Sequence, residues 1–258
     1  AAGGCGVPKP SKGGGAQATA APPPGTQSIP KVDVIAGPGN IYVTLAKKEV
    51  YGEVGIDMLA GPSEILIIAD STQNPVCVAA DMLSQAEHDK LARAILLTFD
   101  EEFAQKVAAE AERQLSLLPR SDIARCALDS AGGIILVKDG KEACALANEI
   151  APEHLEIATA DCEELLKEIR NAGAVFLGSY TPEPVGDYFA GPDHILPTGG
   201  TARFFEVLNA DIFLRKMSVI RYSKEAILED GADIVRLAES EGLSAHANAV
   251  RVRLEGEK

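Results

Sequence analysis

The chain has 258 residues, a formal net charge of -14 and 46% hydrophobic residues. This length can bury a substantial core, and the acidic balance disfavours nucleic acid and anionic membrane surfaces as partners. No apolar run approaches the roughly 20 residues that span a bilayer. The five scattered cysteines, without a CxxC pair, predict reduced thiols and a cytoplasmic protein.

Residues 1–30 are rich in glycine and proline, with Pro22-Pro23-Pro24 as the clearest interruption. Consecutive prolines cannot continue a helix, so this composition predicts a flexible leader. A strand is expected over 32–35, and the Gly37-Pro38-Gly39-Asn40 turn leads into a helix over 41–50. A glycine-rich turn between a strand and a helix can bring backbone amides to a phosphate. A purely structural loop is an equally good reading of this turn.

Strands and helices alternate from residue 65 onward. Apolar runs predict strands over 65–69, 94–99, 134–137, 155–158 and 174–177. Helical spacing is found over 75–87, 101–118, 141–150 and 163–171. The alternation predicts an α/β fold with a Rossmann-like, mostly parallel sheet and helices on its faces.

The C-terminal part has a different pattern. Residues 178–203 form a long connection rich in glycine and proline, and such loops are typically functional or disordered. The elements expected after it are a short helix over 206–210, a strand over 217–222 and helices over 224–241 and 243–250.

These elements predict three parts. The expected parts are an α/β segment over 1–64, an α/β domain over 65–208 and a helical appendage over 209–258.

The stretch from Ala151 to Ile157 places a carboxylate beside an imidazole, directly before an apolar run. Pro152 fixes its own backbone angle and predicts a rigid turn ahead of a buried strand. Glu153 and His154 at a sheet edge could divide the work of moving protons. One would activate water, and the other would accept a substrate proton. A surface turn with two solvated polar residues is the plain alternative.

Gln85 and His88 are three residues apart near the end of a predicted helix, which places both side chains on one face. Together with a carboxylate and a second imidazole, they would form a mixed nitrogen and oxygen set that suits zinc. Alone, this pair is a weak signal, because a histidine at a helix end usually faces water.

All four histidines of the chain fall within four short segments. The segments are Ser84–His88, Ala151–Ile157, Gly186–Thr198 and Leu243–His246, and they follow Gly37–Asn40 and Ala60–Glu64. In this order they closely resemble histidinol dehydrogenase, from about Gly14 to the end. Chains of that family begin far upstream of Ala1, so we expect a C-terminal portion. The family's apolar helix after Gly14 would meet Pro22 after about one turn.

The resemblance implies a homodimer that uses zinc, one ion per subunit, and NAD. It also implies that 1–64 is an incomplete nucleotide-side domain, that 65–208 is the catalytic and metal-binding domain and that 209–258 is a dimerisation appendage. The implied reaction oxidises L-histidinol through L-histidinal to L-histidine. The matching metal ligands are Gln85, His88, Asp187 and His246. Among the catalytic residues, Glu153 would activate water and His154 would accept the substrate's proton.

Further positions match the family's binding residues. The substrate contacts that the resemblance implies are Ser63, Gln85, His88, His154, Asp187, Glu241 and His246. His194 is expected to line the substrate pocket, and the nucleotide contacts match at Gln17 and Asn40. Glu241 and His246 would reach into the partner subunit's site, so only a homodimer would complete it. A solvated helix-end carboxylate is the plain alternative for Glu241.

Three other functions stay open at this point. The same residues could oxidise another polyol or a sulfonated alcohol with NAD. The chain could be an inactive zinc-binding remnant. It could also be a zinc hydrolase in which Glu153 works with metal-bound water, and independence from NAD would favour that reading.

Overall fold

The computed structural model describes residues 13–21 and 25–256, in two compact units that divide between Phe213 and Leu214. The larger unit contains a five-stranded, fully parallel sheet in the order β5-β4-β3-β6-β7. Its strands are β3 (Glu64–Ala69), β4 (Arg93–Thr98), β5 (Gly132–Leu136), β6 (His154–Ala158) and β7 (Ala174–Leu177). The predicted α/β fold with a parallel sheet is confirmed.

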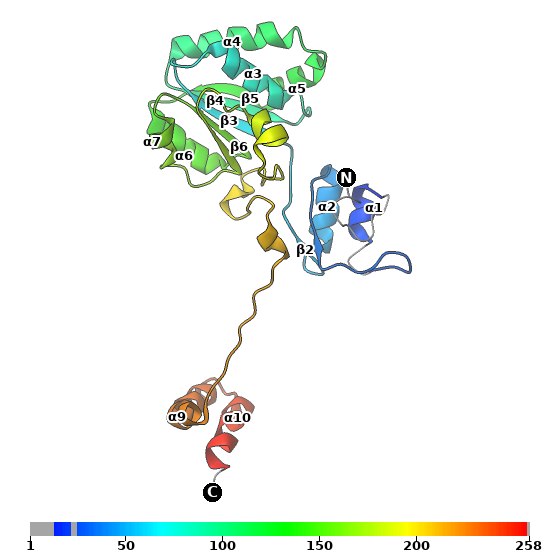
Figure 1. Ribbon diagram of the computed structural model, residues 1–258, viewed down its shortest axis with the longest axis vertical. Coiled ribbons are helices and arrows are strands. Elements are labelled where there is room, and N and C mark those ends of the chain that lie inside the picture. Colours follow the sequence, from blue (N-terminus) through cyan, green and yellow to red (C-terminus); the bar gives the residue numbers. More distant parts are fainter. Residues whose placement is uncertain (1–12, 22–24, 257–258) are drawn as a thin grey trace. The chain divides into compact units, whose positions relative to one another are not determined.

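Helices cover both faces of the sheet (Figure 1). One face carries α3 (Pro75–Ala86), α4 (Glu101–Leu115) and α5 (Ser121–Ala131). The other carries α6 (Gly140–Ile150) and α7 (Cys162–Leu166). All residues of the central strands β3 and β6 are buried, as expected for a parallel sheet covered on both sides.

The alternation of side chains along β6 directs two polar residues towards α3. Leu155 and Ile157 belong to the core beneath α6 and α7, whereas Ala158 belongs to the core beneath α3 and α4. Because successive side chains in a strand point to opposite faces, His154 and Glu156 share the α3 face with Ala158. His154 pairs with Ile65, so these polar groups begin at the amino ends of β3 and β6.

A small substructure precedes the sheet. It consists of α1 (Gly15–Ala20), α2 (Ile41–Val50) and the short parallel strands β1 (Val34–Ile35) and β2 (Gly55–Ile56). The buried Lys47 ammonium contacts Asp57 and the Gly37 carbonyl oxygen, each at 2.5 Å. The Asp57 carboxylate also accepts the Gly37 amide hydrogen at 2.7 Å. These contacts fix the glycine-rich turn before α2. The predicted leader lies partly outside the described residues, including Pro22–Pro24.

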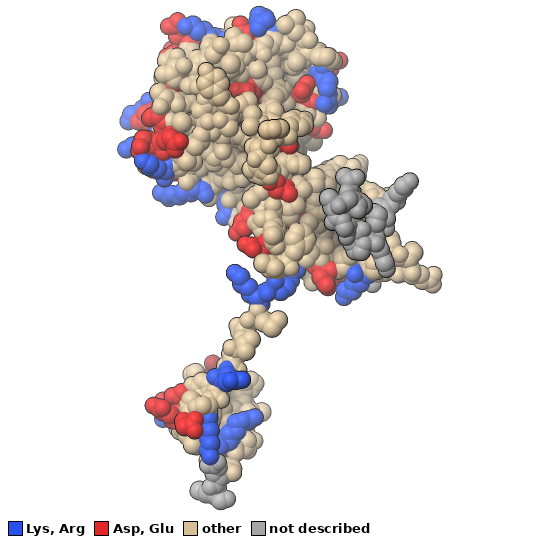
Figure 2. Space-filling model, in the orientation of Figure 1, with Lys and Arg blue, Asp and Glu red and all other residues tan. Residues whose placement is uncertain are grey.

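The smaller unit pairs α9 (Lys224–Ser240) with α10 (Ser244–Glu255), which confirms the helical C-terminal appendage. Buried Gly231 allows close packing, because a Cβ atom there would lie 2.7 Å from the Leu254 side chain. The proposed boundaries at 64 and 208 stay predictions. No helix among residues 13–21 and 25–256 combines the length and apolarity that a membrane crossing needs. On the visible face of the larger unit, acidic and basic side chains are interspersed (Figure 2).

Two predicted elements are wrong. Residues 217–222 form neither helix nor strand, because the part of the chain that the structure describes offers them no strand to pair with. Val219 and Ile220 are 87% and 86% exposed there. Residues 206–209 are irregular, and a short 3-10 helix follows at Ala210–Phe213.

Other boundaries also differ from the predictions. The predicted helix over 163–171 ends at Leu166, and α5 was not predicted. The long connection contains α8 (Glu183–Val185), a π-helix (Gly186–Ala190) and a 3-10 helix (Thr201–Arg203). This connection therefore contains short helical turns, and they hold Glu183 and Asp187 near its start.

Candidate active site

A pocket of about 300 Å³ opens at the amino edge of the sheet. Most of the residues singled out from the sequence of the larger unit line it. They are Ser63, Gln85, His88, Glu153, His154, Asp187 and His194. Pro38 and Gly39 of the glycine-rich turn line the same pocket. The structure thus brings together segments that lie far apart in the sequence.

The turn before β6 fixes the Glu–His pair. Ala151 ends α6 in the left-handed conformation, with φ 51° and ψ 62°, and it is fully buried. A non-glycine residue held there costs roughly 1–2 kcal/mol, so its surroundings must enforce the conformation. The reversal turns the chain into β6, where Glu153 and His154 are 6% and 5% exposed. The sequence-based alternative of a solvated surface turn is therefore wrong.

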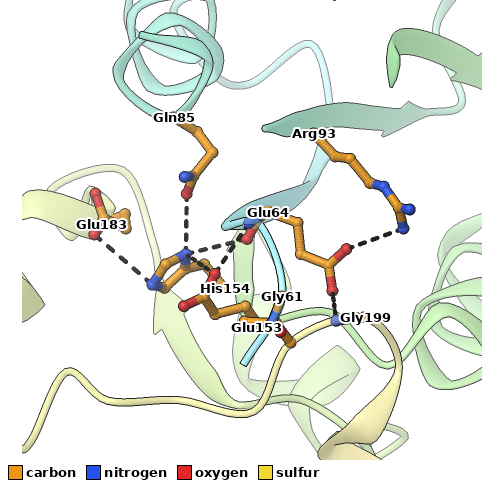
Figure 3. A network of polar contacts seen from close by, with 9 residues as sticks. Gly61, Glu64, Gln85, Arg93, Glu153, His154, Glu183 and Gly199 are labelled. Carbon is orange, nitrogen blue, oxygen red and sulfur yellow. Dashed lines mark hydrogen bonds and ion pairs between the residues drawn. The ribbon is translucent and has the colours of Figure 1, made fainter. Parts of the chain in front are cut away.

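His154 lies at the centre of a network of polar contacts (Figure 3). Its Nδ1 is 3.1 Å from the Glu64 carbonyl oxygen and 3.0 Å from Gln85 Oε1. A backbone carbonyl oxygen can only accept, so Nδ1 carries the hydrogen. Nε2 therefore keeps its lone pair and lies 3.8 Å from Glu183 Oε1. This tautomer presents a free base to the pocket.

Glu153 is held by the same strand residue. Its Oε2 accepts the Glu64 amide hydrogen at 3.0 Å and lies 3.8 Å from His154 Nδ1. Burial raises the pKa of Glu153 to about 8, and the nearby Glu64 carboxylate adds to the effect. Burial lowers the pKa of His154 to about 4. At neutral pH both groups are therefore uncharged, and their contact is not an ion pair.

Glu64 also shapes the wall of the pocket. Its side chain is buried, accepts the Gly199 amide hydrogen at 2.8 Å and lies 3.4 Å from Arg93. The Gly61 amide donates to the Thr198 hydroxyl oxygen of the same loop. Glu64 thus positions the two reactive residues through its backbone and the loop at Gly199 through its side chain (Figure 3).

Several side chains in the pocket could hold a metal ion. One ligand atom each from His154, Glu183 and Asp187 lies within 4.8 Å of the others. Gln85 and His88 lie at the carboxyl end of α3 and line the same pocket. Carboxylate, imidazole and amide oxygen donors suit zinc. The residues present therefore fit such an ion.

The remaining predicted site residues lie elsewhere. Gln17 is exposed on α1, and the Asn40 side chain caps α2 by accepting from two amides of its first turn. Glu241 and His246 belong to the smaller unit and are exposed there. Their proposed roles stay predictions.

Sequence reasoning missed Glu183, Glu156 and Glu64. All three are buried carboxylates beside the reactive pair. Glu156 did leave a signal, because it interrupts the apolar run after His154. Glu183 left none, since it lies between two prolines in a stretch that resembles an exposed loop.

The raised pKa of Glu153 predicts a pH-dependent stability. The folded chain keeps this proton up to about pH 8, whereas the unfolded chain loses it near 4.5. Between these values the folded state binds the extra proton. The free energy of unfolding should therefore fall as pH rises, by about 1.4 kcal/mol per pH unit for this group. Urea unfolding of the metal-free chain at several pH values measures this. The free energy of unfolding should fall less steeply with pH in Glu153→Gln than in the parent chain.

At pH values below the lower limit of that window, Glu153 is protonated in both states, so the parent chain and Glu153→Gln should show the same pH dependence there. Equal slopes in the two chains throughout the window would contradict the assignment of the proton to Glu153.

Together, the fold and the pocket define the class: an α/β protein with a buried Glu–His pair at the amino edge of a parallel sheet. The histidinol dehydrogenase family model matches residues 1–254. The chain belongs to the histidinol dehydrogenase family.

Individual relatives agree with this assignment. The histidinol dehydrogenase of Carboxydothermus hydrogenoformans is 57% identical over 95% of this chain and 57% of its own length. The histidinol dehydrogenase of Geobacter metallireducens is also 57% identical, over 95% of this chain and 56% of its own length. The crystal structure of histidinol dehydrogenase from Elizabethkingia anophelis superposes with a TM-score of 0.87 at 46% identity, over 95% of this chain and 57% of that one. The chain thus spans little more than half the length of these relatives.

Proposed function

We propose that this chain carries the metal-binding and acid–base part of a zinc- and NAD-dependent histidinol dehydrogenase. The reaction would be oxidation of L-histidinol through L-histidinal to L-histidine, in the cytoplasm. The observation that carries this proposal is the convergence of Glu153 and His154 with Gln85, His88 and Asp187 on one pocket. The volume of the pocket, about 300 Å³, and its polar lining suit a small substrate that carries hydrogen-bonding groups.

Both proposed cofactors supply chemistry that side chains lack. When bound, zinc would hold and orient the amino alcohol, and NAD would accept hydride. Gln85, His88 and Asp187, with His246, would hold the ion. Asn40 and Gln17 would contact the nucleotide. The position of Asn40 at the amino end of α2 supports its nucleotide contact, because Pro38 and Gly39 of the adjoining glycine-rich turn line the pocket.

His154 is suited to accept the hydroxyl proton in the first oxidation. Its Nδ1 donates to the Glu64 carbonyl oxygen, which leaves the Nε2 lone pair for the substrate. The pKa of His154 is lowered by burial to about 4, so the imidazole is uncharged before the reaction. Proton transfer to a positioned neutral imidazole lowers the barrier to hydride departure.

Glu153 is suited to activate water for the second oxidation. Water must add to the aldehyde to give a hydrate, whose carbon can then lose a second hydride. The pKa of Glu153, raised by burial to about 8, is close to the pH at which a general base works best. The carboxylate form is the minor form at neutral pH, and its share grows as the pH approaches 8. This form takes a proton from water, and a second proton leaves the hydrate through His154.

The primary test measures NADH formation from histidinol. We expect NADH only when histidinol, NAD and zinc are all present, and a chelator should abolish it. The same assay is run on this chain and on a chain extended to the length of its relatives. Turnover that ignores NAD would instead support a hydrolase, and zinc binding without turnover would support an inactive remnant.

We also propose a homodimer with sites shared across subunits, because Glu241 and His246 lie in a unit of their own. Asp187→Ala and His246→Ala chains should each be inactive alone. After subunit exchange, half of the dimers are mixed and each mixed dimer has one intact site. Activity should therefore recover to about a quarter of the parent value.

A mixture of Asp187→Ala chains with His88→Ala chains is the control. Both residues belong to the larger unit, so mixing should restore nothing. Failure of the first pair to recover, with exchange verified by mass, would exclude the shared arrangement.

A further inference from the structure

A pair of carboxyl groups, buried Glu156 and half-buried Asp81, lies one layer behind the pocket, and the chemistry proposed above does not use it. Glu156 follows His154 by two residues on β6, so both side chains leave the same face of the strand. Asp81 precedes Gln85 by four residues on α3, so these two share one face of the helix. The Glu156 and Asp81 carboxyl groups lie close enough to influence each other's pKa, and His154 Nδ1 hydrogen-bonds Gln85 Oε1 at 3.0 Å. Asp81 and Glu156 thus form a second meeting point between α3 and β6, next to the contact of His154 with Gln85.

Glu156 also contacts the third element of the site. Its Oε1 accepts the Glu183 amide hydrogen at 2.8 Å, and both residues are buried. This amide opens α8, where a helix leaves its first amides without partners of its own. Asp187 follows four residues later, about one helical turn further along the chain. Glu156 therefore joins the segment that carries Asp187 to the strand that carries His154.

A proton between the two carboxyl groups allows them to attract each other. Two carboxyl groups can hydrogen-bond only when one of them is protonated. Burial raises the pKa of both Glu156 and Asp81, which favours a proton on the pair. Glu156 Oε1 meanwhile accepts the Glu183 amide hydrogen, so Glu156 faces both α3 and the segment that begins at Glu183.

We propose that Asp81 and Glu156 are positioning residues that set α3, β6 and the segment 183–187 at the spacing the reactive pocket requires. The inference rests on the function proposed above for what the positioned side chains do. A buried polar pair is a weak support for a fold, since apolar residues of similar volume often replace one at little cost. Its effect here is geometric, because it ties three elements together directly behind His154.

Three chains test this: the parent, the double variant Asp81→Leu with Glu156→Leu, and Glu156→Gln. The first measurement is amide hydrogen exchange of residues 183–190 in the metal-free chain, which needs neither zinc nor turnover. We expect the leucine pair to speed this exchange by about tenfold or more, because one anchoring hydrogen bond is lost. The thermal midpoint should stay within a few degrees of the parent.

Glu156→Gln is the conservative rescue. Its amide oxygen can still accept from Glu183, and its amide nitrogen can still donate to Asp81. Exchange in this chain should match the parent to within about threefold. In a chain extended to the length of its relatives, the leucine pair should lower kcat by about 10- to 100-fold, the usual effect of losing a supporting contact behind a metal site. Glu156→Gln should retain most of the parent's kcat.

Each outcome decides the matter. Parent-like exchange in the leucine pair would overturn the inference. So would a leucine pair that fails to fold, since the pair would then support the fold itself. If Glu156→Gln lost as much exchange protection and kcat as the leucine pair, the hydrogen bonds that bridge the three elements would not be the cause of the effect. If the parent makes no NADH from histidinol, the proposed function fails, but the exchange data still decide the role of the pair.

Discussion

Glu153→Gln is expected to slow oxidation of histidinal far more than oxidation of histidinol. Only the aldehyde step needs activated water, and loss of a general base costs about 100- to 10,000-fold. The glutamine amide can still accept the Glu64 amide hydrogen that Glu153 Oε2 accepts at 3.0 Å, so the local geometry should persist. Stopped-flow measurement of NADH formation from each substrate separates the two steps.

An exposed glutamate provides the control for this substitution. Glu163→Gln on α7 makes the same side-chain replacement but lies outside the pocket, so both steps should proceed at the parent rate. If Glu153→Gln oxidised histidinal as fast as the parent, the role given to Glu153 would be wrong.

His88→Ala is expected to lose zinc, and activity with it. His88 follows the end of α3 and lines the pocket with Gln85 and Asp187, so its removal opens the proposed coordination shell. The loss of affinity should exceed the about 10- to 100-fold that removal of a supporting contact costs. Metal analysis after dialysis, together with competition by a chelator, measures the effect.

His194→Ala is the matched control for the metal, because His194 is a second exposed histidine that lines the same pocket. It should keep zinc and raise KM for histidinol. Full zinc occupancy in His88→Ala would remove this residue from the ligand set.

The parallel sheet was predictable because its strands are short apolar runs separated by helical spacing. The sequence between Ile65 and Ala69 can hardly be anything but a buried strand, and Pro152 predicts the turn before β6. Gln85 and His88 were predictable for the same local reason, since their spacing along a helix fixes which face they share. Local pattern thus accounts for the elements that carry the reactive groups.

Contacts between distant segments could not be predicted in this way. Whether Glu156 meets Asp81 or the Glu183 amide depends on how α3 and α8 pack against β6, and no local pattern contains that information. The strand prediction for 217–222 was wrong because local pattern alone suggested a strand. The apolar residues of this stretch are typical of a strand, but a strand also needs a hydrogen-bonding partner, and the described residues supply none.

The position of the pocket at the amino edge of the sheet has an electrostatic consequence. In a parallel α/β unit, the helices that connect the strands end at this edge, and here α3 ends beside Gln85 while α6 ends just before Glu153. The carboxyl end of a helix carries a partial negative charge of roughly half an elementary charge. The peptide dipoles of both helices therefore favour a cation in the pocket and disfavour a phosphate group. An anionic nucleotide would find the opposite polarity at the amino end of α2, where Pro38 and Gly39 reach the same pocket.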